Sequence, residues 1–322
     1  MHKIKHLFTI VLFLLVVFNC KGQQEGQYSL YMLNPYEYNP AYAGLDFSLS
    51  ANLSYRNQWD VLPGNPKHIG LNAHLPYYKW SGALGVMINN RSQGALDLNT
   101  FGASYNYVIP FLNGLLSTGA RIGFHQLSIT GSEIVTPDGV YVGGINHNDP
   151  ILLEGIDRGF GFRWELGSFF YNKNFKFGVA IQNLPSFEVN LETASFDKVT
   201  HANFMASMNY TLFEKFEVLP SILLKTDFKQ FQSEISSLFK INGNIFGGLS
   251  ARGYSSRSID ALVFITGIEL GKHYTLTYSY DYGLSGLQRV HEGTHEILLN
   301  YNLKKIIGSG RPPKIVYNPR YL

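Results

Sequence analysis

Leu45-Asp-Phe-Ser-Leu-Ser-Ala-Asn-Leu-Ser-Tyr-Arg56 is an unbroken alternation of apolar and polar residues. Successive side chains of a β-strand point to opposite faces of the sheet. The segment therefore predicts a strand with one apolar face and one polar face. Its length matches the roughly 9–11 residues with which a tilted strand crosses a bilayer.

The same alternation recurs along the chain. It is clear at 69–75, 101–109, 116–124, 160–166, 203–210 and 274–282, and weaker at 80–90, 175–183, 216–226, 230–241, 244–254, 258–270 and 294–303. The total is about fourteen strands, and bacterial single-chain barrels have an even number. The pattern predicts an all-β fold, a transmembrane antiparallel up-and-down β-barrel over residues 45–303, preceded by an N-terminal segment that is not a strand.

The connections between these strands sort by parity. The even ones are short: 78–79, 110–114, 172–174, 213–215, 242–243 and 271–272. The odd ones vary and include every long one: 56–67, 91–97, 129–159, 184–199 and 283–293. Short periplasmic turns opposite longer outside loops are typical of an outer-membrane barrel, and the sorting places both ends of the chain in the periplasm. The loop 129–159 is long enough to suggest partner contact or occlusion of the barrel.

A soluble β-sandwich is the alternative reading of the same strands. It predicts polar faces rich in Lys, Glu and Arg. Here the polar faces carry mostly Gly, Ser, Asn and Thr, and only 15% of residues are charged while 15% are aromatic. The membrane barrel is therefore favoured. The net charge of +3 comes without a basic block, so no nucleic-acid partner is indicated.

The first residues resemble a signal peptide. Lys3 and Lys5 precede the apolar run 7–18, and small residues at Cys20 and Gly22 predict cleavage before Gln23. An uncleaved anchor and a lipoprotein site at Cys20 are the alternatives. Cys20 is the only cysteine, so a chain cleaved after Gly22 has no disulfide, no cysteine nucleophile and no thiolate metal site.

One motif suggests catalysis. His291-Glu-Gly-Thr-His295 matches H-E-x-x-H, which binds zinc when it lies on a helix. Gly293 and Thr294 are poor residues for a helix interior, and the motif lies between two alternating segments. A zinc hydrolase is thus the weakest of the functional alternatives. No G-x-S-x-G elbow or phosphate loop is present in the sequence, so we expect no enzyme and no cofactor.

Several charged residues occupy positions predicted to face the lumen. These are Arg56, Arg121, Arg163, Glu165, Arg252 and Asp281. Two interpretations stay open at this point. The charges form ion pairs that fill and rigidify the barrel, or they form a selectivity ring in an open pore.

The segment before the first strand does not alternate. It reads Gln27-Tyr-Ser-Leu-Tyr-Met-Leu-Asn-Pro-Tyr-Glu-Tyr-Asn-Pro-Ala-Tyr-Ala-Gly44, and the first strand ends in Tyr55-Arg-Asn-Gln-Trp59 before Gly64-Asn-Pro66. This combination closely resembles the PorP/SprF family of the type IX secretion system of Bacteroidetes. The residues that carry the resemblance are Asn34, Pro35, Asn39, Pro40, Gly44, Tyr55, Arg56, Asn57, Gln58, Trp59, Gly64 and Pro66. Asn89-Asn90 departs from the Asn-Asp of many members.

The resemblance implies an outer-membrane secretion accessory. Such proteins work with the type IX translocon and periplasmic components, and some export or hold a cognate surface adhesin, including adhesins of gliding motility, through its C-terminal domain. A channel or transporter for small solutes is the alternative function. The expected organisation is a signal peptide (1–22), a periplasmic or plug segment (23–44), the barrel (45–303) in outer-membrane lipid, and a periplasmic tail (304–322).

Overall fold

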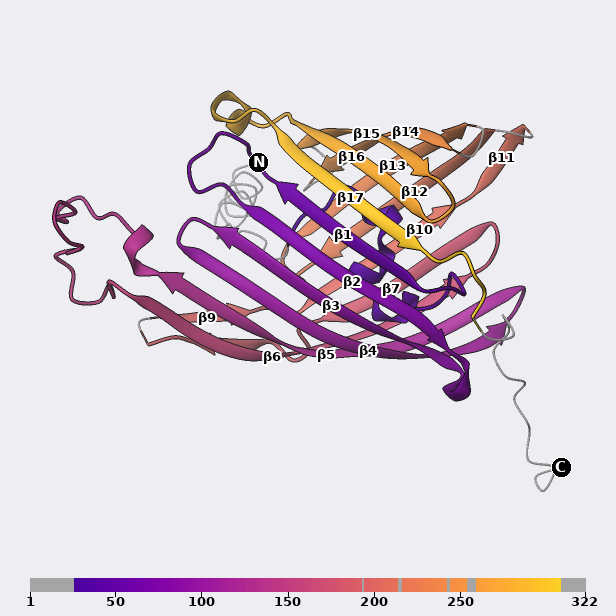
Figure 1. The fold of residues 1–322 in the computed structure, drawn as a ribbon, viewed down its shortest axis with the longest axis horizontal. Coiled ribbons are helices and arrows are strands. Elements are labelled where there is room, and N and C mark those ends of the chain that lie inside the picture. The colour runs from indigo at the N-terminus through magenta and orange to yellow at the C-terminus, as the bar shows by residue number, and fades with distance from the viewer. Residues whose placement is uncertain (1–25, 193, 214–215, 242–243, 254–258, 308–322) are drawn as a thin grey trace, which may run out of the picture.

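The computed structural model describes residues 26–307 except 193, 214–215, 242–243 and 254–258. The signal peptide and most of the tail expected from the sequence lie outside the described residues. Within the described part, antiparallel strands form a closed barrel with short helices inside it (Figure 1). No helix in this part is long and apolar enough to cross a membrane.

The barrel wall has fourteen strand positions, as the sequence predicts. The strands are β1(Ser50–Asn57), β2(Lys67–Tyr77), β3(Gly82–Gln93), β4(Leu96–Phe111), β5(Gly114–Thr130), β6(Ile156–Tyr171), β7(Phe175–Gln182), β10(His201–Met208), β11(Tyr210–Phe213), β12(Phe216–Thr226), β13(Phe231–Ile241), β14(Ile245–Gly253), β15(Ala261–Leu270), β16(Tyr274–Gly283) and β17(Thr294–Asn302). β10 and β11 follow each other along the same neighbour, β12, and so occupy one position.

Two pairings close the barrel. β1 pairs with β17 in the register Ser50↔Asn302 to Asn57↔His295. β10 pairs with β7 on one side and β12 on the other. The wall therefore has no free edge along these strands, which removes the aggregation-prone edges of an open sheet.

The first strand begins later than the alternation predicts. β1 starts at Ser50, and residues 45–49 form turns. Leu45 is only 1% exposed, and Phe47 has a φ of +59°, a left-handed conformation that no regular strand contains. The alternation at 45–49 is thus a property of the turns that lead into β1.

The long connections all lie at one end of the barrel, which also carries the shorter connections 94–95 and 227–230. The short-turn end carries 78–81, 112–113, 172–174 and 271–273, and the long-loop end carries 58–66, 131–155, 183–200 and 284–293. One predicted loop is wrong. Residues 91–97 are mostly strand, because only Gly94 and Ala95 separate β3 from β4, and Gly94 supplies the positive φ (+55°) of a tight hairpin turn.

The long-loop end also contains elements that the sequence does not predict. A separate hairpin, β8(Phe187–Asn190) and β9(Ser195–Lys198), lies between β7 and β10. Two short 3-10 helices, η4(Gly131–Glu133) and η5(Gly286–Val290), lie in the connections that follow β5 and β16. A third, η3(Tyr78–Trp80), lies at the short-turn end.

The wall is apolar outside and polar inside. On β1, Leu53 is 47% exposed whereas its neighbours Asn52 and Ser54 are buried. Ile69 on β2 and Val86 on β3 also point outward, and each is more than half exposed. An apolar outer belt around a polar interior is the arrangement that lipid requires of a spanning barrel.

Residues 26–49, here called the plug, lie inside the barrel. They contain three short helices: η1(Tyr31–Leu33), α2(Pro35–Tyr38) and η2(Pro40–Tyr42). Asn34 precedes Pro35 and Asn39 precedes Pro40, so each of the last two helices begins with proline at its first position, where the missing N–H costs nothing. The repeated Asn-Pro pairs thus divide the plug into compact turns.

Candidate functional site

The plug crosses the lumen from one end to the other. At the long-loop end, the Gly26 carbonyl accepts a hydrogen bond from Lys225 Nζ at 3.2 Å. At the short-turn end, the Gly44 N–H donates to His74 Nδ1 at 3.0 Å, and Leu303 N–H donates to the Leu49 carbonyl at 3.0 Å. The loop sorting predicts a periplasmic N-terminal end, yet the first described residues lie at the long-loop end.

Ser29 holds the plug to the wall through charged partners. Its hydroxyl donates to the Asp281 carboxylate (2.7 and 2.8 Å) and accepts from Arg56 Nη1 (3.0 Å) and Arg252 Nη2 (2.6 Å). All four residues are buried. We call this set the Ser29 latch. Its bonds involve ionised groups and are therefore stronger than neutral hydrogen bonds.

Two further carboxylates contact the arginines of the latch. Glu296 Oε2 lies 2.8 Å from Arg56 and also accepts from the Ser29 N–H at 2.8 Å. Glu234 lies 2.8 Å from Arg252, which also lies 3.0 Å from Asp281. Loss of one partner from such a buried network costs about 3–5 kcal/mol, because the remaining charge stays buried. The network therefore fixes the position of the plug.

A second ion-pair cluster lies on β5 and β6. Glu165 is fully buried between Arg121 (3.0 Å) and Arg163 (2.7 Å). Arg121 also donates to the carbonyls of Tyr36 and Glu37, and its guanidinium lies 4.5 Å from the centre of the Tyr36 ring. These contacts join β5 and β6 to the plug.

Asparagine side chains connect the plug to four adjacent strands. Asn300 donates to Asn52 (2.6 Å), and Asn52 donates to Asn72 (2.9 Å) and to Asn34 of the plug (3.1 Å). Glu37 accepts from Asn72 at 3.1 Å and from Asn89 at 2.6 Å. Amides both donate and accept, so a row of them satisfies buried polar atoms without adding charge.

The motif residues of the plug make close contacts. Asn39 caps η2 by accepting from the Ala41 N–H at 2.9 Å, and its amide donates to the carbonyls of Ser168 and Val179. Gly44 has a φ of +69°, and a Cβ there would lie 2.4 Å from Ala83 Cβ. Only glycine fits this close and left-handed position.

Apolar contacts hold the other side of the plug. Tyr31 and Tyr38 belong to one cluster with Leu223 of β12, and Leu30 packs against Leu238 and Leu298. Burial raises the pKa of Tyr31 and of Tyr38 above the usual value, and the charge of Glu234 raises both further. The two phenols therefore remain neutral hydrogen-bond donors inside the lumen.

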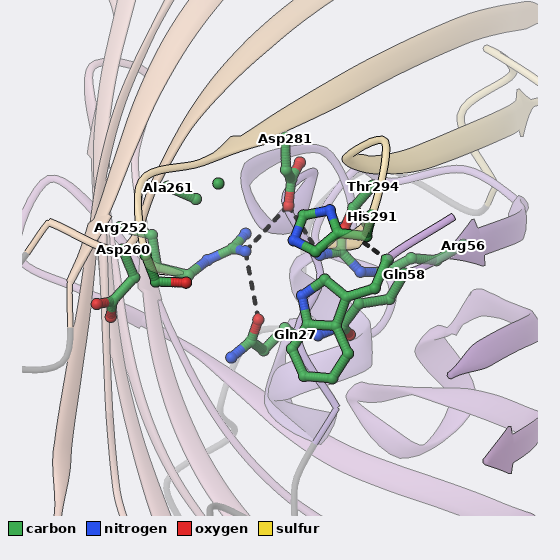
Figure 2. Close-up of a pocket in the computed structure, with 12 residues that line it drawn as sticks. Gln27, Arg56, Gln58, Arg252, Asp260, Ala261, Asp281, His291 and Thr294 are labelled. Atoms are coloured by element: carbon green, nitrogen blue, oxygen red, sulfur yellow. Dashed lines mark hydrogen bonds and ion pairs between the residues drawn. The ribbon is translucent and has the colours of Figure 1, made fainter. Parts of the chain in front are cut away.

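Two motif residues that follow β1, Gln58 and Trp59, line a cavity at the long-loop end. It measures about 240 Å³, and three latch residues form part of its lining (Figure 2). Its lining residues include Gln58, Trp59, His291, Arg56, Arg252 and Asp281. The Trp59 and His291 rings stack with centroids 6.3 Å apart. Trp59 and Val61 have φ values of +56° and +75°, and such strain in non-glycine residues persists only where surrounding bonds impose it.

The remaining motif residues brace this loop or face outward. Asn57 donates to Asp60 at 2.8 Å, and Gln58 N–H donates to the Pro66 carbonyl at 2.9 Å. The Gly64 carbonyl accepts from Gly94 N–H at 2.9 Å. Tyr55 is 41% exposed on the outer wall. The motif residues therefore lie in the plug, in the cavity loop, on the lipid-facing side and, for Arg56, on the inner wall at the latch.

The H-E-x-x-H segment forms no helix. His291 lies in the loop after η5, and His295 lies at the start of β17, where its ring hydrogen-bonds Tyr278 at 2.7 Å. The two histidines therefore do not share a helical face. The described residues contain no group of three or more His, Cys, Asp or Glu placed to hold a metal ion.

Sequence reasoning missed several residues of the site. These are Ser29, Glu37, Glu234 and Glu296, and each contacts a charged or amide partner inside the lumen. Glu234 and Glu296 occupy inward positions in strands whose alternation is weak, and Ser29 and Glu37 lie in a segment without alternation. The polar residues of the plug were the available signal, because a segment that fills a polar lumen needs donors and acceptors of its own.

A closed barrel with an apolar outer belt and a lumen filled by its own N-terminal segment is an integral outer-membrane β-barrel. The chain belongs to the PorP/SprF family: the model for the type IX secretion system membrane protein PorP/SprF matches residues 20–301. The resemblance seen in the sequence is thereby confirmed. No curated protein matches the chain.

Solved barrels resemble this one at low sequence identity. The outer membrane protein Omp33 of Acinetobacter baumannii is 8% identical with a TM-score of 0.47, and the match covers 80% of this chain and 99% of that one. The toluene transporter TbuX of Ralstonia pickettii is 11% identical with a TM-score of 0.48, and the match covers 84% and 92%.

Proposed function

We propose that this type IX secretion component binds a secreted surface protein, adhesin-like in kind, and supports its export or attachment. Gliding motility is one process that such an adhesin serves. The single observation that carries the proposal is the plug, which occupies the lumen and is held by ion pairs, asparagine bonds and apolar contacts. A lumen filled in this way leaves the loops and rims for recognition.

The proposed orientation follows from the loops. The long-loop end faces outward and the short-turn end faces the periplasm, as in other outer-membrane barrels. The tail 304–322 then starts in the periplasm, where it is placed to contact periplasmic secretion components, and the secreted protein engages the long-loop end through its C-terminal domain. Residues 1–22 serve as the signal peptide that delivers the chain to this membrane.

Deletion of the gene followed by proteomics of the cell surface tests the function. We expect one or a few secreted proteins to disappear from the surface while their transcripts persist. Complementation with the wild-type gene restores them. An unchanged set of surface proteins after deletion rejects the accessory role.

We propose neither catalysis nor a cofactor. A diffusion channel for small solutes is the competing function. It requires a continuous path past the plug, and the two cavities of about 240 and 270 Å³ lie toward opposite ends of the lumen. Electrical conductance of the purified barrel separates the two functions and is treated below.

A further inference from the structure

The β8–β9 hairpin lies on the inner wall at the long-loop end, apart from the barrel sheet. Val189 packs against Leu98 and Leu127, which point inward from β4 and β5. Phe187 stacks on the His125 ring with centroids 5.8 Å apart. A two-stranded hairpin is only marginally stable alone, so this apolar cluster holds it in place.

Two inward glycines of β6 make room for the hairpin. A Cβ on Gly159 would lie 2.5 Å from the Asn190 carbonyl oxygen, and one on Gly161 would lie 2.4 Å from the Phe187 ring. The Glu192 N–H, next to the tip, donates to Asp157 at 3.0 Å. Strand β8 therefore lies next to β6, and Phe196 of β9 also packs against the apolar cluster. The outer edge of β9 is the edge that points away from β8.

The outer edge of β9 has no partner strand in the described part of the chain. Leu191 N–H donates to the Ala194 carbonyl, so the hydrogen-bonded pairs of the hairpin include Val189–Phe196. Ser195 and Asp197 belong to the alternate, non-hydrogen-bonded pairs, and their backbone groups point away from β8. No backbone hydrogen bond reaches them among the described residues. This is the kind of edge that accepts an added strand.

The exposed face of the hairpin is acidic. Glu188 lies directly opposite Asp197, and both are exposed. Side chains of a non-hydrogen-bonded pair approach more closely than those of the other kind, and like charges in that position destabilise a hairpin. A basic side chain on a neighbouring third strand would relieve this repulsion.

We propose that β9 accepts an extended segment of the secreted protein as a third strand. The segment carries Lys or Arg at alternate positions, so that these side chains lie beside Asp197 and Glu188. Backbone hydrogen bonds to Ser195 and Asp197 supply affinity, and the alternate charges supply specificity. This inference rests on the proposed function, since it names the surface at which the secreted protein docks.

Paired substitutions in the chromosomal gene test the edge and the charge separately. Ser195→Pro removes an outward N–H and keeps the charge, whereas Ser195→Ala keeps the N–H and is its matched control. Proline is tolerated on strand edges, so the hairpin survives the change. Asp197→Arg reverses the charge, and Asp197→Asn only removes it. Barrel abundance and its heat-dependent gel migration verify folding.

The readout is the surface amount of the protein that is lost on gene deletion. We expect at least a tenfold loss for Ser195→Pro and Asp197→Arg, an intermediate loss for Asp197→Asn, and less than a twofold change for Ser195→Ala. A photo-crosslinking residue at position 195 is expected to join that same protein within a stretch with alternate basic residues. Adducts to a stretch without them contradict the proposed specificity.

The failure of this inference differs from failure of the proposed function. If gene deletion removes a surface protein and both Ser195→Pro and Asp197→Arg leave it at the wild-type level, strand addition is overturned and the accessory function stands. If deletion removes no surface protein, the accessory function fails. Absence of any exported protein from crosslinks at position 195 then overturns strand addition as well.

Discussion

At the scale of single residues, one hydroxyl connects the plug to three charged side chains. Ser29→Ala removes the donor to Asp281 and the acceptor for Arg56 and Arg252. A hydrogen bond to a charged group contributes about 1.5–3 kcal/mol. Because Asp281 stays paired with Arg56 and Arg252 in the variant, we expect the free energy of unfolding to fall by the value of about one such bond, ~2 kcal/mol. Denaturant titration of the barrel in detergent micelles measures this.

Ser279→Ala is the matched control for that variant. Ser279 is equally buried, but its hydroxyl has no hydrogen-bond partner in the described structure. A buried hydroxyl without a partner costs free energy, so we expect its removal to leave the free energy of unfolding unchanged or slightly higher. Equal losses for the two serines would show that the Ser29 contacts contribute nothing specific.

Glu165 is the residue whose loss we expect to cost most. Glu165→Gln leaves Arg121 and Arg163 buried together without their shared carboxylate. Removal of one partner from a buried ion pair costs about 3–5 kcal/mol. The same denaturant titration checks the value, with the exposed Glu188→Gln as control. A loss as small as that of the control contradicts a role for this cluster in holding the barrel.

The sequence predicts which charges face the lumen but not what they contact. Alternation places Arg121 and Asp281 on the inner faces of their strands, because the two-residue period can be read from neighbouring residues alone. Their partners Glu37 and Ser29 lie far away in sequence, in a segment without period. Contacts between residues so far apart in sequence depend on how the plug turns at its two Asn-Pro pairs. The local sequence pattern does not determine those turns.

At the scale of elements, the sequence predicts where the strands lie better than it predicts which side chains pack inside the barrel. The strands with weak alternation, β12, β13, β15 and β17, carry inward leucine, valine and isoleucine that pack against Leu30 and Tyr31 of the plug. Apolar residues on both faces blur the period. Weak alternation in these strands thus indicates that an apolar part of the chain packs against their inner faces.

The β8–β9 hairpin depends on the space left by two glycines. Gly161→Val places a side chain where the Phe187 ring lies, so we expect the hairpin to leave the wall while the barrel stays closed. Limited proteolysis of the purified barrel then shows new cleavage within residues 187–198. Gly155→Ala is the control, since a Cβ there meets nothing within 4 Å. Unchanged cleavage for both variants contradicts the packing role of Gly161.

At the scale of the whole molecule, the plug determines whether ions pass. The wild-type barrel is expected to show no sustained conductance in a planar bilayer, because the plug contacts the wall at both ends and in the middle. A variant that lacks residues 27–43 is expected to conduct in discrete steps, provided that it folds by heat-dependent gel migration. Equal conductance of both proteins supports the channel function instead.

The whole molecule also has an orientation, which single-cysteine labelling tests. Cys20 is the only cysteine and lies in the proposed signal peptide, so the wild-type protein is the control and is expected to stay unlabelled once residues 1–22 are removed. Gly144→Cys lies in the loop 131–155, and Lys272→Cys and Lys305→Cys lie exposed at the short-turn end. A maleimide that cannot cross the outer membrane is expected to label only position 144 in intact cells, and all three after permeabilisation. Because the turn 271–273 and the start of the tail share one end of the barrel, labelling of 272 or 305 in intact cells would reverse the whole assignment, including the outward position of the cavity and of the β9 edge.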